Sequence, residues 1–338
     1  MGRPSRRMDD TDAGGRRPGP WQQTRRPHPE HVEEAGKASV GNMSCRARSE
    51  MGLEVMVPSP LQLVDDDRLG RHDVKLYLKR DDLIHPDVPG NKWRKLKYNL
   101  QHASEEGHRR LLTFGGAYSN HIRATAAAGY YYGFSTVGII RGEEHFPLNE
   151  VLTEAVGFGM HLVYMDRVTY RRKASPEIET SLRKQFGDFY VIPEGGSNVL
   201  AVRGCAELPS EIGEPFDVIC CACGTGGTLA GIAAGLQAGR QAIGFSVLKG
   251  GDFLRQDVIR LQEAYGRTTT NWSIETDYHF GGFARRNAAL DHFIDDFRNR
   301  HGLKLNWVYV AKMLCGVYDL VSAGTFGRET TIVAVVTG

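Results

Sequence analysis

The chain has 338 residues, of which 41% are hydrophobic and 24% are charged, and its formal net charge is +2. These values are typical of a globular protein with a sizeable core in one large domain or two moderate ones. Charge so close to balance argues against nucleic acid or an anionic membrane as the main partner, because such partners require a concentrated basic face. No stretch is long and apolar enough to cross a bilayer, so we expect a small-molecule ligand.

Residues 1–52 differ from the rest in carrying arginine pairs, several Pro and Gly, and almost no apolar periodicity. We interpret them as a disordered basic tail. A targeting peptide is disfavoured, because an apolar core segment is missing and acids such as Asp9, Asp10 and Glu33 are unusual in transit peptides. An over-extended gene start, with Met43 or Met51 as initiator, is an alternative.

The chain has six cysteines, too few for a disulfide scaffold in a protein of this size. Cys220, Cys221 and Cys223 crowd into one apolar run, without the paired spacing or the His cluster of a zinc site. We therefore expect reduced thiols, a cytoplasmic protein and no metal.

From about Asp73 onward, short apolar or β-branched runs alternate with helix-length segments. The predicted strands are Val74 to Leu78, Arg110 to Phe114, Thr136 to Ile140, His161 to Met165, Phe189 to Ile192, Asp217 to Cys221, Ile243 to Leu248 and Thr331 to Val336; the clearest predicted helices are 92–106, 119–132 and 227–238. This alternation predicts parallel sheet with helices on both faces. The number of strands favours two α/β lobes with a cleft between them, and a cleft is the usual place for chemistry.

Lys92 heads a predicted helix directly after the Pro89-Gly90 turn, within the string Gly90 to Leu96. We take it as a candidate covalent anchor for a cofactor. A solvated surface lysine is the ordinary alternative.

The glycine-rich loop Gly224 to Thr228 follows a buried strand and precedes a helix. Its glycines allow backbone N–H groups to converge at a helix N-terminus, and Thr225 and Thr228 add hydroxyl donors, so we predict a phosphate-binding loop. It is not a Walker A loop, and Leu229 stands where the third glycine of G-x-G-x-x-G belongs. A tight turn without a ligand is the alternative.

Ser119, Asn120 and His121 begin another predicted helix after two glycines. Ser119 fits a helix N-cap. The functional alternative is a clamp for a carboxylate or a ring oxygen, made from a hydroxyl, an amide and an imidazole beside exposed N–H groups.

Together these motifs resemble the fold-type II pyridoxal-phosphate enzymes, specifically the 1-aminocyclopropane-1-carboxylate deaminase and D-cysteine desulfhydrase family. The resemblance runs from Pro58 to the last residues, and the motifs follow in the family's order. The most specific ones are Gly-Asn-Lys-x-Arg-Lys-Leu, Ser-Asn-His, Gly-Gly-Ser-Asn, Gly-Thr-Gly-Gly-Thr and Val308-Tyr309-x-x-Lys312. The resemblance implies a tryptophan synthase β-like fold with two open, mostly parallel sheets. We expect a large domain (53–105 plus 190–338), a small domain (106–189) and a homodimer.

The resemblance also implies roles for single residues. Lys92 would form the Schiff base with pyridoxal 5'-phosphate and take the Cα proton. Asn120 would bond the cofactor's ring oxygen, and Thr337 would face its pyridine nitrogen. The phosphate would lie on the loop made of Gly224, Thr225, Gly226, Gly227 and Thr228. The substrate would contact Ser119, Asn120, His121, Tyr309 and the position held by Phe283, with Ser119 and Tyr309 counted as catalytic beside Lys92.

Chemistry supports these assignments. Lysine attacks an aldehyde only as the neutral amine, which burial favours, and once released it lies over Cα as a general base. A neutral threonine at the pyridine nitrogen leaves the ring a weaker electron sink than a carboxylate would. Expulsion of a β-substituent then competes well with transamination.

Within the family, ring-opening deaminases carry a glutamate directly after the active-site tyrosine and a leucine in the C-terminal loop. Val310 and Thr337 occupy those places here, so the resemblance favours D-cysteine desulfhydrase-like elimination to pyruvate, ammonia and sulfide. Phe283 replaces a second tyrosine, and Val310 and Ala311 also depart from the desulfhydrase pattern. A ring-opening deaminase, a β-replacement enzyme and a catalytically reduced cofactor-binding protein therefore stay open.

Overall fold

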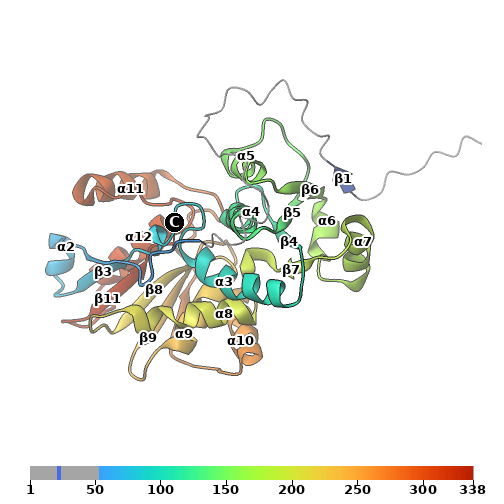
Figure 1. Cartoon of the computed structure of the whole chain (residues 1–338). Helices are drawn as coiled ribbons and strands as arrows, with labels where there is room; N and C mark the ends of the chain where they lie inside the picture. The colour runs from blue at the N-terminus through green and yellow to red at the C-terminus, as the bar shows by residue number, and fades with distance from the viewer. Residues whose placement is uncertain (1–20, 24–52, 338) are drawn as a thin grey trace, which may run out of the picture.

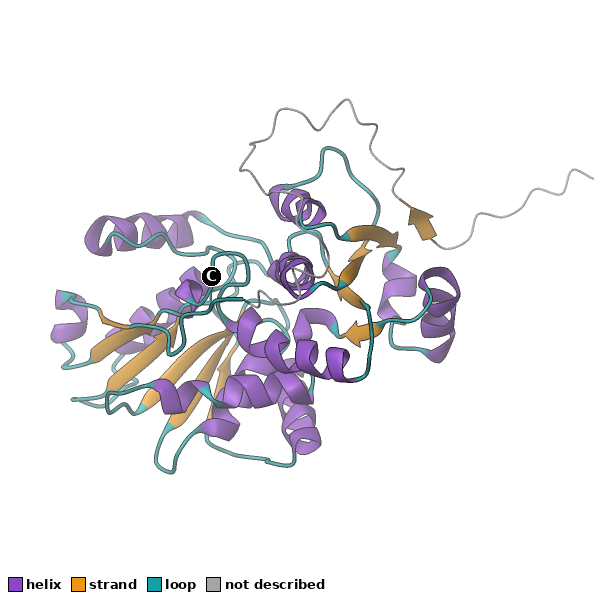
Figure 2. Ribbon diagram, in the orientation of Figure 1, coloured by secondary structure: helices purple, strands orange, loops and turns teal. Residues whose placement is uncertain are grey.

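The computed structural model describes residues 21–23 and 53–337. Its strands form two sheets (Figures 1 and 2). Within the described residues, the larger sheet has six strands in the order β10-β9-β8-β11-β3-β2, and the smaller sheet has five in the order β1-β6-β5-β4-β7. The predicted α/β architecture with two mostly parallel sheets is confirmed.

The larger sheet is built around strand β8. Its strands are β2 (Leu61–Leu63), β3 (Lys75–Lys79), β8 (Val218–Cys223), β9 (Gln241–Ser246), β10 (Trp272–Glu275) and β11 (Thr331–Val335). Every pair is parallel except β2 with β3. All of β8 is buried, because its alternate side chains enter different cores: Val218 and Cys220 on one face, Ile219 and Cys221 on the other. Burial on both faces explains why this strand reads as a continuous apolar run.

Helices cover both faces of the larger sheet, as Figure 1 shows. The core of one face includes residues of α11 (Ala288–His301) and α12 (Val310–Ser322). The core of the other face includes residues of α8 (Val199–Ala206), α9 (Gly227–Gly235) and α10 (Phe253–Tyr265).

The smaller sheet has β4 (Arg110–Gly115), β5 (Ser135–Arg141), β6 (His161–Met165) and β7 (Tyr190–Ile192), all parallel. Helices α3 (Asn91–Glu105), α4 (Asn120–Tyr132) and α5 (Glu150–Gly157) pack on one face, and α6 (Arg167–Arg171) and α7 (Pro176–Phe186) on the other. Helix α3 also touches α8 of the larger lobe, because Gly204 lies against the carbonyl of Arg94. The boundary that we predicted between the large and the small domain, at residues 105 and 106, therefore remains a prediction.

One strand lies in the segment for which we predicted disorder. β1 (Trp21–Gln23) pairs antiparallel with β6, whose outer edge would otherwise leave backbone groups unpaired. The prediction of a wholly unstructured tail is therefore wrong for these three residues. The remainder of residues 1–52 lies outside the described part of the chain.

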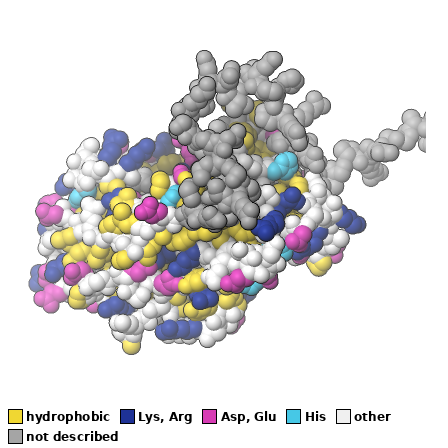
Figure 3. Space-filling model, viewed as in Figure 1, with side chains coloured by type: hydrophobic (Ala, Val, Ile, Leu, Met, Phe, Trp, Pro, Cys, Tyr) yellow, Lys and Arg dark blue, Asp and Glu magenta, His cyan; other side chains and the backbone are white. Residues whose placement is uncertain are grey.

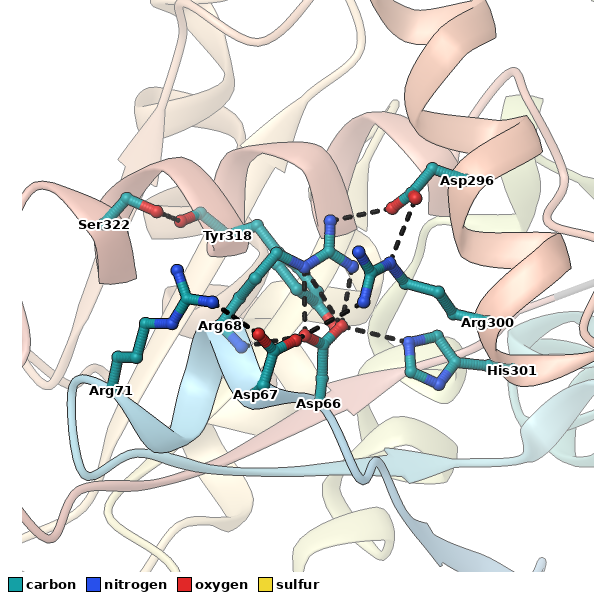
Figure 4. Close-up of polar contacts among 9 residues, drawn as sticks. All are labelled: Asp66, Asp67, Arg68, Arg71, Asp296, Arg300, His301, Tyr318 and Ser322. Atoms are coloured by element: carbon teal, nitrogen blue, oxygen red, sulfur yellow. Dashed lines mark hydrogen bonds and ion pairs between the residues drawn. The ribbon is translucent and has the colours of Figure 1, made fainter.

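A polar cluster ties the short helix α2 (Asp67–Gly70) to α11 and α12 (Figure 4). The buried carboxylate of Asp66 accepts hydrogen bonds from Arg68 and from the Tyr318 hydroxyl at 3.0 Å, and His301 Nε2 lies 3.1 Å away. Arg68 also pairs with Asp296 of α11 at 2.8 Å. These contacts hold the chain before β3 against α11 and against α12, whose N-cap residue is Tyr309.

Most predicted elements occur close to their predicted bounds. Strand 161–165 is matched fully, whereas the strand predicted over 243–248 spans Gln241–Ser246, and the helix predicted to end at 238 ends at Gly235. Figure 3 shows Lys and Arg interspersed with Asp and Glu on the face in view. Among the described residues, none of the helices combines the length and apolar character that a membrane span requires.

Candidate active site

A cavity of about 400 Å³ lies where both sheets present the carboxyl ends of their strands. Its lining includes residues that follow β4, β7, β8 and β11. The structure places most of the predicted site residues on its wall: Lys92, Ser119, Asn120, His121, Gly224, Thr225, Gly226, Thr228, Phe283, Tyr309 and Thr337. Gly227 does not line it; a Cβ there would lie 2.6 Å from Ser197 Oγ. Residues distant in sequence thus converge on one space.

Lys92 is fixed at the start of α3 by close backbone packing. Gly90, which precedes the helix, has φ 62°, a conformation that favours glycine. A Cβ on Gly90 would lie 2.0 Å from the carbonyl oxygen of Thr337. Asn91 Nδ2 donates to Thr228 Oγ1 at 2.7 Å, which ties the helix start to the glycine-rich loop.

Burial and, to a smaller extent, the positive charge of Lys95 together lower the pKa of Lys92 from 10.5 to about 7. Taking the amine out of water disfavours its charged form. A large share of Lys92 is therefore the neutral amine near neutral pH, the form that attacks a carbonyl carbon.

Lys95 brings a buried cation to the glycine-rich loop. Its side chain is 3% exposed, and Nζ donates to Gly195 O at 3.1 Å and to Ser197 Oγ at 3.2 Å. Ser197 Oγ in turn lies 2.6 Å from Thr225 Oγ1. Burial lowers the pKa of Lys95, and no ion pair among residues 53–337 gives it a carboxylate partner.

A phosphate group fits this corner of the cavity. The loop leads into α9, whose first N–H groups lack helical acceptors and carry partial positive charge. Lys95, Thr225 and Ser197 add a charge and two hydroxyls beside it. Sequence reasoning gave Lys95 no role at the loop; the available signal was its i+3 spacing from Lys92, which puts both lysines on one face of α3.

Ser119 is the N-cap residue of α4, as predicted, but its side chain makes no capping hydrogen bond. His121 is 1% exposed, and its Nε2 lies 2.8 Å from Thr113 Oγ1, whereas Nδ1 has no hydrogen-bond partner. Burial and the charges of Lys92 and Lys95 hold the pKa of His121 well below its usual value. A neutral imidazole supplies no charge to a carboxylate, so the Ser119 hydroxyl and the N–H groups that begin α4 are the better donors here.

Tyr309 and Phe283 also line the cavity, and the Tyr309 ring lies 3.4 Å from the Cβ position at Gly224 of the glycine-rich loop. Asn306 Oδ1 accepts from the N–H groups of Val308 and Tyr309 at 3.0 and 3.1 Å, which fixes the entry to α12. The Tyr309 and Phe283 rings meet edge-on with centroids 6.0 Å apart. Burial, followed by the charge of Glu194, raises the pKa of Tyr309, so its hydroxyl stays protonated and can donate a proton or a hydrogen bond.

Lys312 holds the segment that carries Phe283. Its side chain is fully buried, and Nζ donates to His279 O at 2.9 Å and to Gly282 O at 2.8 Å. The same segment contains Phe280 and Ala284, both with φ 50°, a conformation that costs L-residues energy. The sequence singled out Lys312 only as part of a motif; its contacts, some thirty residues away, could not be read from spacing.

Thr337 follows β11, is 7% exposed and lines the cavity. Val310, by contrast, is fully buried and does not reach the cavity wall. Within the described residues, no cluster of three or more His, Cys, Asp or Glu side chains could hold a metal ion.

A family profile described as "Pyridoxal-phosphate dependent enzyme" matches residues 56–338. A protein of Thermotoga maritima named "Putative 1-aminocyclopropane-1-carboxylate deaminase" is 33% identical over 280 residues, which cover 78% of this chain and 89% of that protein. The D-cysteine desulfhydrase of Salmonella typhi is 29% identical over 302 residues, covering 83% and 91%.

Solved structures show the same likeness. The crystal structure of an ACC deaminase homologue has a TM-score of 0.74 at 26% identity, covering 87% of this chain and 94% of that one. A threonine deaminase isoform from Solanum lycopersicum has a TM-score of 0.58 at 19% identity and covers 84% and 80%; at that identity the likeness concerns the fold alone.

Proposed function

Because the chain belongs to the pyridoxal-phosphate-dependent enzymes of fold type II, in the 1-aminocyclopropane-1-carboxylate deaminase and D-cysteine desulfhydrase family, we propose that it eliminates the β-substituent of D-cysteine. The net reaction consumes one water and gives pyruvate, ammonia and hydrogen sulfide. Pyridoxal phosphate, when bound, withdraws electrons from Cα of the attached amino acid and so makes its proton acidic.

The observation that carries this proposal is the cavity itself. It brings together an amine whose pKa is lowered to about 7, a glycine-rich loop with a buried cation, and a tyrosine whose raised pKa keeps it protonated. We assign the phosphate to Gly224–Thr228 with Lys95, and the covalent link to Lys92. Asn120 and Thr337 line the same space, and we assign them to the ring oxygen and the pyridine nitrogen that the cofactor would present.

We assign carboxylate binding, removal of the Cα proton and proton donation to the leaving group to different parts of the cavity. The Ser119 hydroxyl and the N–H groups that begin α4 orient the substrate carboxylate. Lys92, as the neutral amine, takes the Cα proton. Tyr309, whose hydroxyl is protonated at neutral pH as in any tyrosine, donates a proton toward the departing sulfur. The acidic group that ring opening requires after the tyrosine is missing, since Val310 is apolar and buried.

The test is release of sulfide and pyruvate by cofactor-loaded protein from D-cysteine, with L-cysteine and 1-aminocyclopropane-1-carboxylate in parallel. We expect both products from D-cysteine and no 2-oxobutanoate from the cyclopropane. Ring opening without sulfide release would replace the desulfhydrase assignment with the deaminase one. No product from any of the three, with cofactor bound, would mean that the substrate lies elsewhere in the family's chemistry.

A further inference from the structure

Arg141 is a cation of the cavity wall that the proposed reaction does not use. It ends strand β5 and lines the cavity. One guanidinium nitrogen lies 3.5 Å from the position that a Cβ on Gly116 would take, so the group sits beside the loop that leads to Ser119. Among residues 53–337, Arg141 forms no ion pair with an acidic side chain.

The acids that line the cavity are already paired. Glu194 pairs with Lys173 at 3.1 Å, and Asp257 pairs with Arg260. Lys173 and Arg141 both lie near the Tyr170 ring, with their charged groups 4.7 and 5.6 Å from its centroid. Two cations and one carboxylate in this corner leave one positive charge without an acidic partner.

The other cations of the cavity have assigned partners or roles. Lys95 donates to the residues beside the glycine-rich loop, and Lys92, whose pKa is about 7, is assigned the covalent link to the cofactor. The substrate carboxylate has its donors at the start of α4, on Ser119 and the N–H groups that follow. Arg141 is therefore available to bind a second anionic group. A guanidinium can bind a carboxylate through two parallel hydrogen bonds.

We propose that Arg141 recognises an anionic group at the far end of the substrate's side chain. The substrate class is then an amino acid whose β-substituent carries a carboxylate or a similar anion. The reaction in this inference rests on the proposed elimination. The claim that Arg141 binds an anion rests only on the charges that line the cavity. The volume of about 400 Å³ lies within the range of ligand sites for small molecules.

S-(Carboxymethyl)cysteine is a suitable probe, because its near-isosteric amide, S-(carbamoylmethyl)cysteine, differs mainly in charge. Elimination breaks the Cα–H and Cβ–S bonds; with one water it yields pyruvate, ammonia and thioglycolate. Both enantiomers of each compound are assayed with the wild type, Arg141→Met, Arg141→Gln and Arg167→Met. Arg167 is the matched control: its guanidinium lies 3.6 Å from the Cβ position at Gly142, yet it does not line the cavity.

We expect the wild type to show a KM about tenfold lower for the acid than for the amide, or ~1.4 kcal/mol. In both Arg141 variants the two KM values should converge, while Arg167→Met should keep the preference. Equal KM values in the wild type, or a preference that survives both Arg141 variants, would overturn the inference. If both Arg141 variants raise the KM of the acid and of the amide by the same factor, Arg141 binds the α-carboxylate, and the inference is overturned as well.

A binding measurement separates this inference from the proposed function. Glutamate and glutamine carry the same charge difference and have no β-leaving group, so calorimetric titration of the holoenzyme reports binding alone. An Arg141-dependent preference for glutamate supports the inference even if D-cysteine is not turned over. Equal binding of both amino acids to the wild type would sink the inference even if D-cysteine is a good substrate.

Discussion

Arg94 and Asp81 form a buried two-point ion pair, with Nε to Oδ2 at 2.7 Å and a terminal nitrogen to Oδ1 at 2.8 Å. Their side chains are 1% and 0% exposed. Arg94 also donates to both Glu211 oxygens, at 2.6 and 2.8 Å, and the Asp81 carbonyl accepts from the Gly90 N–H at 2.8 Å. The pair thus fixes the helix start that presents Lys92.

Removing one partner of this pair should be costly. Arg94→Met leaves the buried Asp81 carboxylate without its ion-pair partner, whereas Glu211 keeps Lys79 at 3.6 Å. Breaking such a buried pair typically costs about 3–5 kcal/mol. Urea unfolding measures the loss. Arg71→Met, which removes a pair whose side chains are 72% and 58% exposed, is the control and should cost about 1 kcal/mol or less. Equal losses in the two variants would contradict the assigned role of the pair.

Gly90→Ala should lower both stability and cofactor affinity. Its Cβ would collide with the Thr337 carbonyl at 2.0 Å, in addition to the cost of φ 62°. Gly107→Ala separates these effects, because Gly107 has φ 80° and open space around it. Thermal unfolding and cofactor titration should show a larger loss for Gly90→Ala. If both variants lose equally, backbone strain alone accounts for Gly90.

Cofactor capture should follow the protonation of Lys92. Its folded-state pKa is lowered from 10.5 to about 7. The fraction of neutral amine therefore rises as the pH passes through about 7, and deprotonation is nearly complete well below pH 10. When the rate constant for pyridoxal phosphate uptake by cofactor-free protein is plotted against pH, it should rise with a midpoint at about 7. Lys95→Met should move the midpoint upward, because the Lys95 charge lowers the pKa of Lys92. A midpoint at about 10.4, as for an exposed lysine, would argue against this environment.

Lys312→Met should loosen the wall that carries Phe283. The change removes the Lys312 donor from the carbonyls of His279 and Gly282, which keep backbone N–H donors at 3.0 and 3.1 Å. Each lost hydrogen bond therefore costs about 0.5–1.5 kcal/mol. We expect KM to rise more than kcat falls, together with faster proteolysis between residues 279 and 286. Lys304→Met, at an exposed position, should change neither. A fall in kcat alone would point to a different role for Lys312.

Tyr309→Phe should slow turnover by about a hundredfold or more if the hydroxyl acts as general acid. The ring and its contact with Phe283 are kept, so the cofactor spectrum should persist. Steady-state rates measure the loss of turnover, and absorbance of the bound cofactor shows whether cofactor binding is kept. Parallel loss of cofactor and activity would make Tyr309 a structural residue.

Local sequence signals were sufficient for most of the strands and for the residues at their carboxyl ends. β8 was readable because burial on both faces demands a continuous apolar run, and the Pro-Gly turn marked the start of α3, which begins at Asn91. The short strands β2 and β10 escaped notice, since three or four residues give almost no periodicity. Lys95 and Lys312 were missed for another reason: their partners are backbone carbonyls and a hydroxyl brought near only by the tertiary fold.

Mapping the covalent link tests the central claim most directly. Cofactor-loaded protein is reduced with borohydride, digested, and its peptides are sequenced by mass spectrometry, beside Lys92→Ala and Lys95→Met. The account predicts that the pyridoxyl group lies on Lys92 in the wild type and in Lys95→Met, and that Lys92→Ala carries none. A reduced link on Lys95, or one that persists in Lys92→Ala, would contradict it.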